Sequence, residues 1–128
     1  MRVLCVDDDG ANRQVLRSML DVVGARVLEA SDACAALAVI DTEAVDAVLM
    51  DLRMPGMDGL SAVRHLRERR DVKADLPVIV VTAETGAHLR AECLAAGADE
   101  VISKPIAMTK LLQTLGQTLN RRGRTVLT

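Results

Sequence analysis

The chain has 128 residues and a formal net charge of -2, and half of its residues are hydrophobic. This length suits one domain and leaves no room in the sequence for a separate output domain, such as a DNA-binding domain. The balanced charge argues against a nucleic-acid surface, and every apolar run falls far short of the roughly 18 residues that a membrane span needs. The first residues also lack the layout of a signal peptide, so we expect a cytoplasmic protein that does not enter the membrane.

Five short apolar segments alternate with segments of helical spacing. The predicted strands are residues 3–6, 25–28, 45–50, 77–81 and 101–102. Continuous apolar strands separated by helices indicate a parallel sheet that is covered on both faces. Because crossovers between parallel strands are right-handed, we expect a flavodoxin-like, doubly wound (βα)5 fold with a five-stranded parallel sheet of order 2-1-3-4-5.

The three cysteines share no close spacing, which argues against a disulfide framework and against a zinc site. They are Cys5, Cys34 and Cys93. We expect all three to be small buried side chains.

Polar residues follow most of the predicted strands. Asp7, Asp8 and Asp9 follow the first strand, Asp51 the third and Thr82 the fourth, and Lys104 comes shortly after the fifth. Because the carboxyl ends of parallel strands share one edge of the sheet, we expect these side chains to converge at a ligand site there.

The expected acidic cluster needs compensating positive charge. Asp7, Asp8 and Asp51 bring about three negative charges into one cleft, where their repulsion and loss of hydration are costly. Lys104 supplies one positive charge, and a divalent cation would supply two more. Carboxylate and carbonyl oxygens without nearby His or Cys favour Mg²⁺.

Four stretches of the sequence, in their order and spacing, resemble one family. They are "VDDDG", "LMDLRMPGMDG", "VIVVTAE" and "SKPI", and they resemble the receiver domain of two-component response regulators. The resemblance extends from Arg2 to about Leu119. We therefore assign residues 1–120 to a receiver domain and residues 121–128 to a basic C-terminal tail.

The resemblance implies a chemical role for each residue of the cluster. Asp51 is implied as the phosphoacceptor, which takes a phosphoryl group from a phosphohistidine or from a small donor such as acetyl phosphate. Asp8, Asp51 and the backbone carbonyl of Arg53 are implied as Mg²⁺ ligands, with Asp7 acting through a bound water.

The resemblance also implies two further groups on the phosphoryl oxygens. Thr82 and Lys104 are implied to bond that group from opposite sides, and the Lys104–Pro105 peptide bond is expected to be cis. The domain would accept and release its own phosphoryl group rather than turn over a separate substrate as an enzyme.

Three residues beside the cleft are expected to modulate the chemistry. Arg53 and Glu84 lie two residues after Asp51 and Thr82, at positions that in the family govern how readily water reaches the phosphoryl group. Their opposite charges predict an ion pair that forms a partial lid. Ala83 is small and leaves room for a phosphodonor.

The sequence departs from the family at Val101, where receivers carry Tyr or Phe; the whole chain lacks Phe, Tyr and Trp. Valine cannot swing between buried and exposed positions with comparable area, so the usual aromatic readout at this switch position is missing. We expect the loop "AETGAH" and the helix after it to carry the response instead.

The resemblance implies two kinds of partner. A histidine kinase or a histidine phosphotransfer protein would dock on the first helix, where Arg13 and Arg17 lie on the polar face. A downstream protein target would read the phosphorylated state, and the basic tail could hold an anionic ligand.

Other functions remain as alternatives. Asp7-x-Asp9 is similar to the nucleophile motif of haloacid-dehalogenase-like phosphatases, but the chain has no acidic residue after Lys104 that could complete their metal site. A receiver-like binding module that works without phosphorylation is the second alternative. A start at Met1 favours a stand-alone regulator over the receiver of a hybrid histidine kinase.

Overall fold

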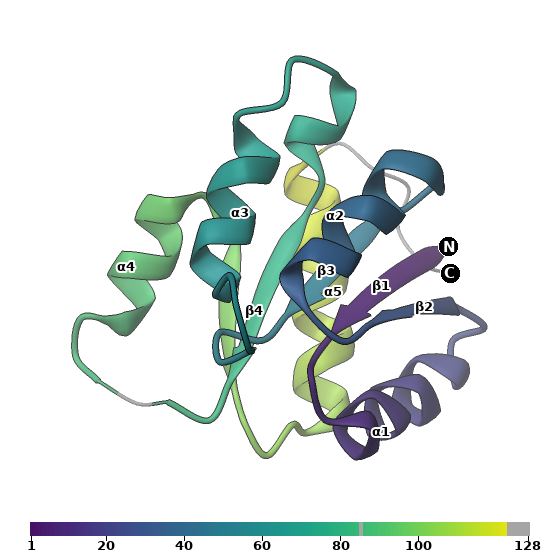
Figure 1. Cartoon of the computed structure of the whole chain (residues 1–128). Helices are drawn as coiled ribbons and strands as arrows, with labels where there is room; N and C mark the ends of the chain where they lie inside the picture. The colour runs from purple at the N-terminus through teal and green to yellow at the C-terminus, as the bar shows by residue number, and fades with distance from the viewer. Residues whose placement is uncertain (85, 123–128) are drawn as a thin grey trace.

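The computed structural model describes residues 1–84 and 86–122. Within these residues strands and helices alternate as the sequence predicts (Figure 1). In chain order the elements are β1 (Arg2–Val6), α1 (Gly10–Asp21), β2 (Arg26–Ala30), α2 (Ala33–Thr42), β3 (Ala47–Met50), α3 (Gly59–Arg67), the short 3-10 helix η1 (Val72–Asp75), β4 (Val78–Thr82), α4 (Leu89–Ala96), β5 (Glu100–Ser103) and α5 (Met108–Arg121).

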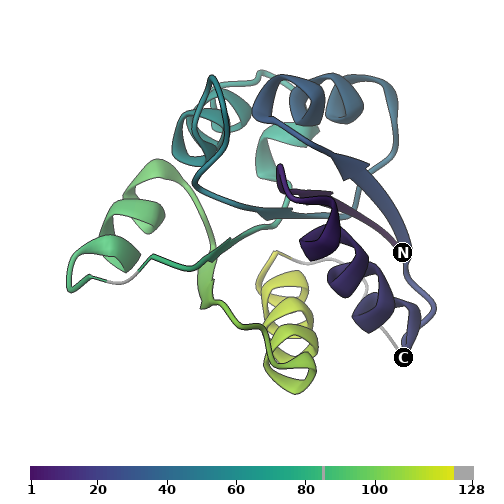
Figure 2. The same ribbon diagram turned by 60° about the horizontal axis from the view of Figure 1, so that its bottom comes forward.

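The strands form one parallel sheet in the order β2-β1-β3-β4-β5, which confirms the predicted topology. Figure 2 shows α1 and α5 on one face of this sheet and α2 and α3 on the other. Side chains of α4 pack into the same hydrophobic cluster as those of α2 and α3. The fold is therefore a doubly wound sandwich of three layers.

Burial on both faces explains the unbroken apolar strands. Alternate residues of β1 enter opposite clusters: Leu4 and Val6 pack towards α2 and α3, whereas Val3 and Cys5 pack towards α1 and α5. All five residues of β4 are buried. A polar residue within such a strand would lose its hydration on either face, so polar residues collect where the strands end.

The two edge strands are longer than the sequence predicts. The expected ranges 25–28 and 101–102 correspond to β2 (Arg26–Ala30) and β5 (Glu100–Ser103). Each edge strand pairs on one side only, so parts of it face solvent and carry polar side chains such as Glu29 and Glu100. Those polar residues obscure the apolar pattern from which the strand limits were predicted.

The cysteines follow the prediction in two of three positions. Cys5 and Cys93 are buried, and burial raises the pKa of the Cys5 thiol to about 12. The prediction is wrong for Cys34, which is exposed. Ala33 and Ala36 take the inward positions of α2, and Cys34 lies between them on the outer side of the turn.

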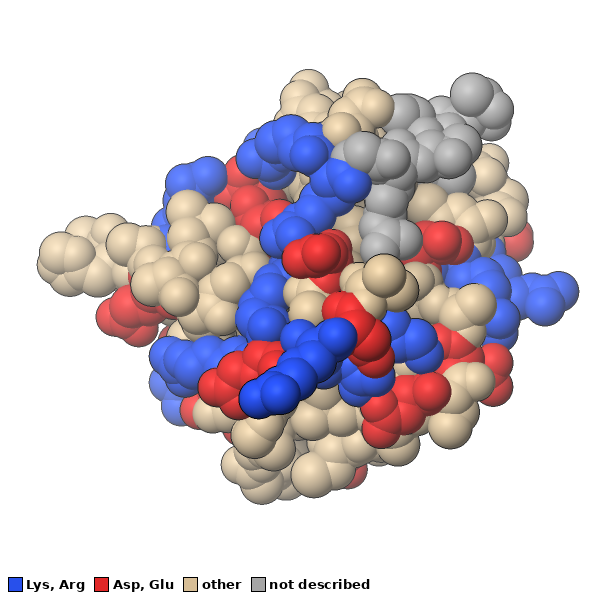
Figure 3. All heavy atoms as spheres, turned by 90° about the horizontal axis from the view of Figure 1, so that it is seen from above, with Lys and Arg blue, Asp and Glu red and all other residues tan. Residues whose placement is uncertain are grey.

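Charged side chains of both signs interleave on the face seen in Figure 3, which lies at the end of the sheet opposite the carboxyl ends of the strands. Arg67 of α3 donates to the carbonyls of Gly97 and Leu76 and to the carboxylate of Asp99. Asp99 also accepts from Arg122, 2.7 Å away. This network ties the end of α5 to α3 and to the start of β4.

The predicted C-terminal tail falls mostly outside the described residues, since the structure describes nothing of residues 123–128. Its first residue, Arg121, is the last residue of α5. Among the helices of the described residues, none combines the length and the apolar character needed to cross a membrane.

A prediction concerns Gly59, the first residue of α3. A Cβ added here would lie 2.1 Å from the carbonyl oxygen of Asp51. Gly59→Ala must therefore shift the backbone that carries Asp51, and we expect it to lower the free energy of unfolding by about 1–3 kcal/mol, measured by urea titration. Gly116→Ala is the control, because a Cβ in this turn of α5 meets nothing within 4 Å; it should stabilise the protein by about 0.5–1 kcal/mol. Equal unfolding curves for wild type and Gly59→Ala would contradict the prediction.

Candidate functional site

Three carboxylates converge at the carboxyl ends of β1 and β3. Val6 of β1 pairs with Met50 of β3, so the next residues leave the sheet side by side. Each of Asp7, Asp8 and Asp51 offers one carboxylate oxygen, and these oxygens all lie within 4.8 Å of one another. Asp7 and Asp51 are buried, with 2% and 7% of their surface exposed, whereas Asp8 is exposed. The cluster therefore opens to solvent on the side of Asp8.

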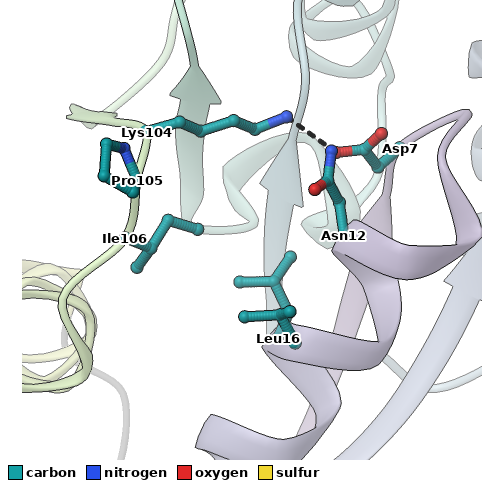
Figure 4. Close-up of a pocket in the computed structure, with 7 residues that line it drawn as sticks. Asp7, Asn12, Leu16, Lys104, Pro105 and Ile106 are labelled. Carbon is teal, nitrogen blue, oxygen red and sulfur yellow. Dashed lines mark hydrogen bonds and ion pairs between the residues drawn. The ribbon is translucent and has the colours of Figure 1, made fainter.

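Lys104 approaches the cluster from the loop between β5 and α5. Its Nζ lies 2.9 Å from Asp7 Oδ2 and 3.7 Å from Asp51 Oδ2. Figure 4 shows the lysine side chain reaching across to Asp7. The peptide bond between Lys104 and Pro105 is cis, as predicted.

The pKa values of Asp51 and Lys104 are both raised, for different reasons. Burial raises the pKa of Asp51, and the charge of Asp7 adds to the rise against the opposing effect of Lys104. Burial alone lowers the pKa of Lys104, but the hydrogen bond to Asp7 and the attraction of Asp51 outweigh it, so the pKa of Lys104 is raised. One ammonium group thus faces three carboxylates, and the site carries an excess of negative charge.

The residues of the cluster fit a Mg²⁺ ion. All their side-chain donors are carboxylate oxygens that already lie close together, and their charge is not balanced by Lys104 alone. Hard divalent cations prefer such oxygen ligands and retain several waters. Asp8 and Arg53 also line one hollow of about 410 Å³ beside the cluster, which leaves room for those waters and for a phosphoryl group.

Thr82 ends β4 and is almost completely buried, with 1% of its surface exposed. Its Oγ1 accepts a hydrogen bond from the backbone N–H of Glu84, 3.0 Å away. Its carbonyl accepts from the backbone N–H of Lys104 at 2.8 Å. The threonine therefore links the end of β4 to the loop that carries the lysine.

Arg53 and Glu84 form the ion pair that the sequence predicts. The Arg53 side chain is 82% exposed, and its hydrogen bond to Glu84 raises the pKa of the guanidinium group. The pair bridges the loop after β3 and the loop after β4. Ala83, which lies between Thr82 and Glu84, is exposed.

The sequence that carries these strand-end acids, the hydroxyl and the lysine matches a known family. The model of the response regulator receiver domain matches residues 3–116. The chain belongs to this family. It is a receiver domain of the two-component type, and the match does not favour the phosphatase alternative.

Relatives of this receiver domain occur in two kinds of protein. Sensor histidine kinase GacS of Pseudomonas protegens is 38% identical over 116 residues, which make up 89% of this chain and 13% of the kinase. Response regulator MprA of Mycobacterium leprae is 40% identical over 121 residues, or 94% of this chain and 52% of the regulator. The chain thus spans about half or less of the length of these relatives.

A solved structure shows the same fold with metal present. The receiver domain of sensor histidine kinase PA1611 from Pseudomonas aeruginosa PAO1 has a TM-score of 0.84 and 32% identity to this chain. The match covers 93% of this chain and 97% of that one, whose crystal structure has a magnesium ion coordinated in its active-site cleft.

Val101 lies half-buried on β5 of this receiver domain. It lines a hollow of about 240 Å³ together with Glu84, Leu89 and Ser103, among others. Val101 therefore borders open space between β5 and the start of α4.

A third hollow, which no pattern in the sequence indicates, lies between α1 and the loop before α5 (Figure 4). It measures about 210 Å³, and its lining residues are Asp7, Asn12, Val15, Leu16, Lys104, Pro105 and Ile106. Its walls are mostly apolar, and it reaches the ion pair of Asp7 and Lys104. Val15 of α1 is 49% exposed beside it.

The polar face of α1, where we expect the partner to dock, carries ion pairs within the domain. Arg13 and Arg17 both donate to the carboxylate of Glu29 on β2. Arg13 also donates to the carbonyl oxygen of Asp7. The two guanidinium groups are thus bound to the domain itself, a contact hidden from sequence reasoning because Glu29 lies on a different element.

Two other aspartates at the edge of the site cap helices. Asp9 Oδ1 accepts from the N–H of Ala11 at 2.8 Å at the start of α1. Asp58 Oδ1 accepts from the N–H of Ser61 at 2.8 Å at the start of α3. Both side chains satisfy N–H groups that a helix leaves unpaired.

A prediction follows from the charge excess. Because folding raises the pKa of Asp51, its negative charge destabilises the fold near neutral pH. With metal removed by EDTA, Asp51→Asn should raise the free energy of unfolding by about 1 kcal/mol, the usual size of a single-residue effect, as measured by urea titration at pH 7. A less stable Asp51→Asn variant under these conditions would count against the proposed charge excess.

Asp58→Asn is the matched control for that measurement. The hydrogen bond from the Ser61 amide lowers the pKa of Asp58, so its charge does not destabilise the fold. Asn also caps helices well. The control should therefore leave the free energy of unfolding unchanged or slightly lower.

Proposed function

We propose that this receiver domain takes a phosphoryl group onto Asp51 in a Mg²⁺-dependent reaction and thereby changes its binding to a downstream protein. The observation that carries the proposal is the position of Asp51, a buried carboxylate at a strand end with Lys104 on one side and the other two acids on another.

In the proposed reaction a carboxylate oxygen of Asp51 attacks the phosphorus atom of the donor. With a phosphohistidine donor the P–N bond breaks and the imidazole leaves with the electron pair. Phosphoryl transfer needs in-line positioning and neutralisation of oxygen charge more than it needs an acid or a base. The Lys104 ammonium would neutralise the charge on one phosphoryl oxygen. It already lies beside the carboxylates of Asp7 and Asp51.

Mg²⁺, held by Asp8, Asp51 and the Arg53 carbonyl and by Asp7 through a water, would supply the remaining positive charge. The Thr82 hydroxyl would donate a hydrogen bond to another phosphoryl oxygen. Its oxygen already accepts from the Glu84 N–H, and a hydroxyl can accept and donate at once.

The proposed phosphodonors are the histidine kinases and histidine phosphotransfer proteins with which receiver domains interact, and the proposed place of reaction is the cytoplasm. The apolar hollow beside Val15 and Pro105 reaches the Asp7–Lys104 pair. We infer that the partner helix which carries the phosphohistidine packs there. We place the contact at this apolar hollow rather than at Arg13 and Arg17, because both arginines of α1 already bind Glu29.

The output side of the proposal centres on the loop after Thr82. A phosphoryl group that draws the Thr82 hydroxyl would act on the hydrogen bond to Glu84, which lines one hollow together with Leu89 at the start of α4. Val101, at the family's switch position, borders the hollow at that place, but it has no ring to move, so the loop after Thr82 stays the proposed carrier of the response. An anionic ligand at the tail stays a prediction, because most of the tail lies outside the described residues.

The central test is phosphorylation by acetyl phosphate with Mg²⁺, followed by intact mass. We expect wild type to gain the mass of one phosphoryl group and Asp51→Asn to gain none. Asp58→Asn, which removes a nearby carboxylate without touching the cluster, should be labelled like wild type. Intact mass is the suitable readout because the chain has no Trp whose fluorescence could report the reaction. An unlabelled wild type, or an Asp51→Asn variant that is labelled equally, would refute the proposal.

A further prediction concerns the lifetime of the phosphorylated state. If Arg53 and Glu84 form a lid, Arg53→Ala and Glu84→Ala should each shorten the lifetime severalfold, because water reaches the phosphoryl group more easily. The double variant should be no faster than either single one, since both remove the same contact. The measurement is the decay of the phosphorylated mass after acetyl phosphate is removed.

Arg69→Ala is the control for this lifetime. Arg69 also forms an exposed ion pair, with Asp71 and Asp41 near η1, at the opposite end of the sheet. It should leave the lifetime as in wild type. Unchanged decay in both lid variants would show that the two charges do not restrict water.

A further inference from the structure

The guanidinium group of Arg13 connects three segments beside the acidic cluster. From α1 it donates through Nη1 to the carbonyl oxygen of Asp7 at 2.5 Å and through Nε to Glu29 Oε1 on β2 at 2.9 Å. Its side chain is only 20% exposed. Arg13 therefore holds a backbone atom of the cluster, although it contacts none of the three carboxylates.

The Asp7 carbonyl lies where the sheet pairing of β1 has ended. The N–H of Asp7 still donates to Ala30 of β2, at 3.1 Å, and β1 itself ends at Val6. The carboxylate of Asp7 is held separately, through Oδ1 by the N–H of Asp9 and through Oδ2 by Lys104, each at 2.9 Å.

The contact with Asp7 also constrains Asp8. A peptide unit is planar, so the direction of the Asp7 carbonyl fixes the direction in which the chain continues to the Asp8 Cα. Asp8 is the exposed member of the cluster and has no other support of this kind among the hydrogen bonds of the described residues. Its position thus depends on the peptide that Arg13 holds.

Glu29 in turn fixes Arg13. Hydrogen bonds from Arg17 and Arg13 lower the pKa of Glu29, so this carboxylate is ionised at neutral pH. Arg17 donates to the other oxygen, Oε2. The two arginines share one acid, but only Arg13 also bonds to Asp7 in the described part of the chain.

We propose that Arg13, held by Glu29, is a positioning residue that sets the affinity of the acidic cluster for Mg²⁺ through the peptide between Asp7 and Asp8. This inference rests on the proposed metal site. Groups that orient metal ligands from outside the coordination shell typically change metal affinity about 10- to 100-fold when they are removed.

The direct test is a Mg²⁺ titration without any phosphodonor, followed by the amide NMR signals of the loops after β1 and β3. Arg13→Gln should raise the dissociation constant about 10-fold or more. Arg17→Gln, which removes a neighbouring arginine from the same Glu29, should stay close to wild type. Arg13→Lys should recover part of the loss, because an ammonium group can still donate to the carbonyl but lacks the fork that also reaches Glu29.

A kinetic measurement separates positioning from a general structural role. In labelling by acetyl phosphate, Arg13→Gln should need more Mg²⁺ for half-maximal rate but reach the wild-type rate at saturating Mg²⁺. A rate that stays low at saturating Mg²⁺ would mean that the substitution disturbs the whole site, and it would overturn the proposal. A dissociation constant equal to that of wild type, or an equal loss in Arg17→Gln, would overturn it as well.

These outcomes also separate this inference from the proposed function. If wild type is phosphorylated and Arg13→Gln binds Mg²⁺ normally, only the role of Arg13 falls. If wild type binds Mg²⁺ but is not phosphorylated, the proposed function falls and the titration alone decides the role of Arg13. A wild type that binds no Mg²⁺ overturns both.

Discussion

The repulsion between Asp7 and Asp51 is the constraint around which this domain is organised. Parallel pairing of β1 and β3 places both residues at the same edge of the sheet, and burial deprives both of most of their hydration. Lys104 offsets part of the charge from the loop after β5. An acidic, partly desolvated cleft repels phosphate by itself and attracts a divalent cation, so the chemistry of the site depends on a charge that the chain does not supply.

The sheet determines where this charge can be placed. Its central strands are buried on both faces, so their polar side chains stand only where the strands end. Asp7, Asp51 and Thr82 each stand at the end of such a strand, and their backbones are fixed by the ladder that precedes them. Gly59 adds to this precision, because its missing side chain lets α3 begin directly against the Asp51 carbonyl. A rigid sheet thus holds the groups proposed to react, while loops carry Lys104, Arg53 and Glu84.

The sequence predicted the fold and the convergence of the cluster because both follow from local patterns. Apolar runs, strand-end acids and the order of motifs are all visible along the chain. Contacts between elements that local patterns do not encode were missed, notably the bonds of Arg13 to Glu29 and to the Asp7 carbonyl. The exposure of Cys34 was missed for a similar reason: a short apolar helix shows which residues are small but not which face packs on the sheet.

The aspartates near the site show how the surroundings of one residue type divide its roles. Asp9 and Asp58 accept hydrogen bonds from helix N–H groups. Asp99 accepts hydrogen bonds from two arginines and a strand amide at the far end of the sheet. Among the ion pairs of the described residues Asp51 has only Lys104, at 3.7 Å, and burial raises its pKa although backbone N–H groups of Leu52 and Arg53 oppose the rise. A carboxylate held in this way keeps an oxygen available for attack, and a phosphoryl group on it would meet Thr82 next. Since Val101 provides no ring that could move into the hollow beside α4, we propose the hydrogen bond between Thr82 and Glu84 as the connection through which a change at Asp51 reaches the surface of the domain.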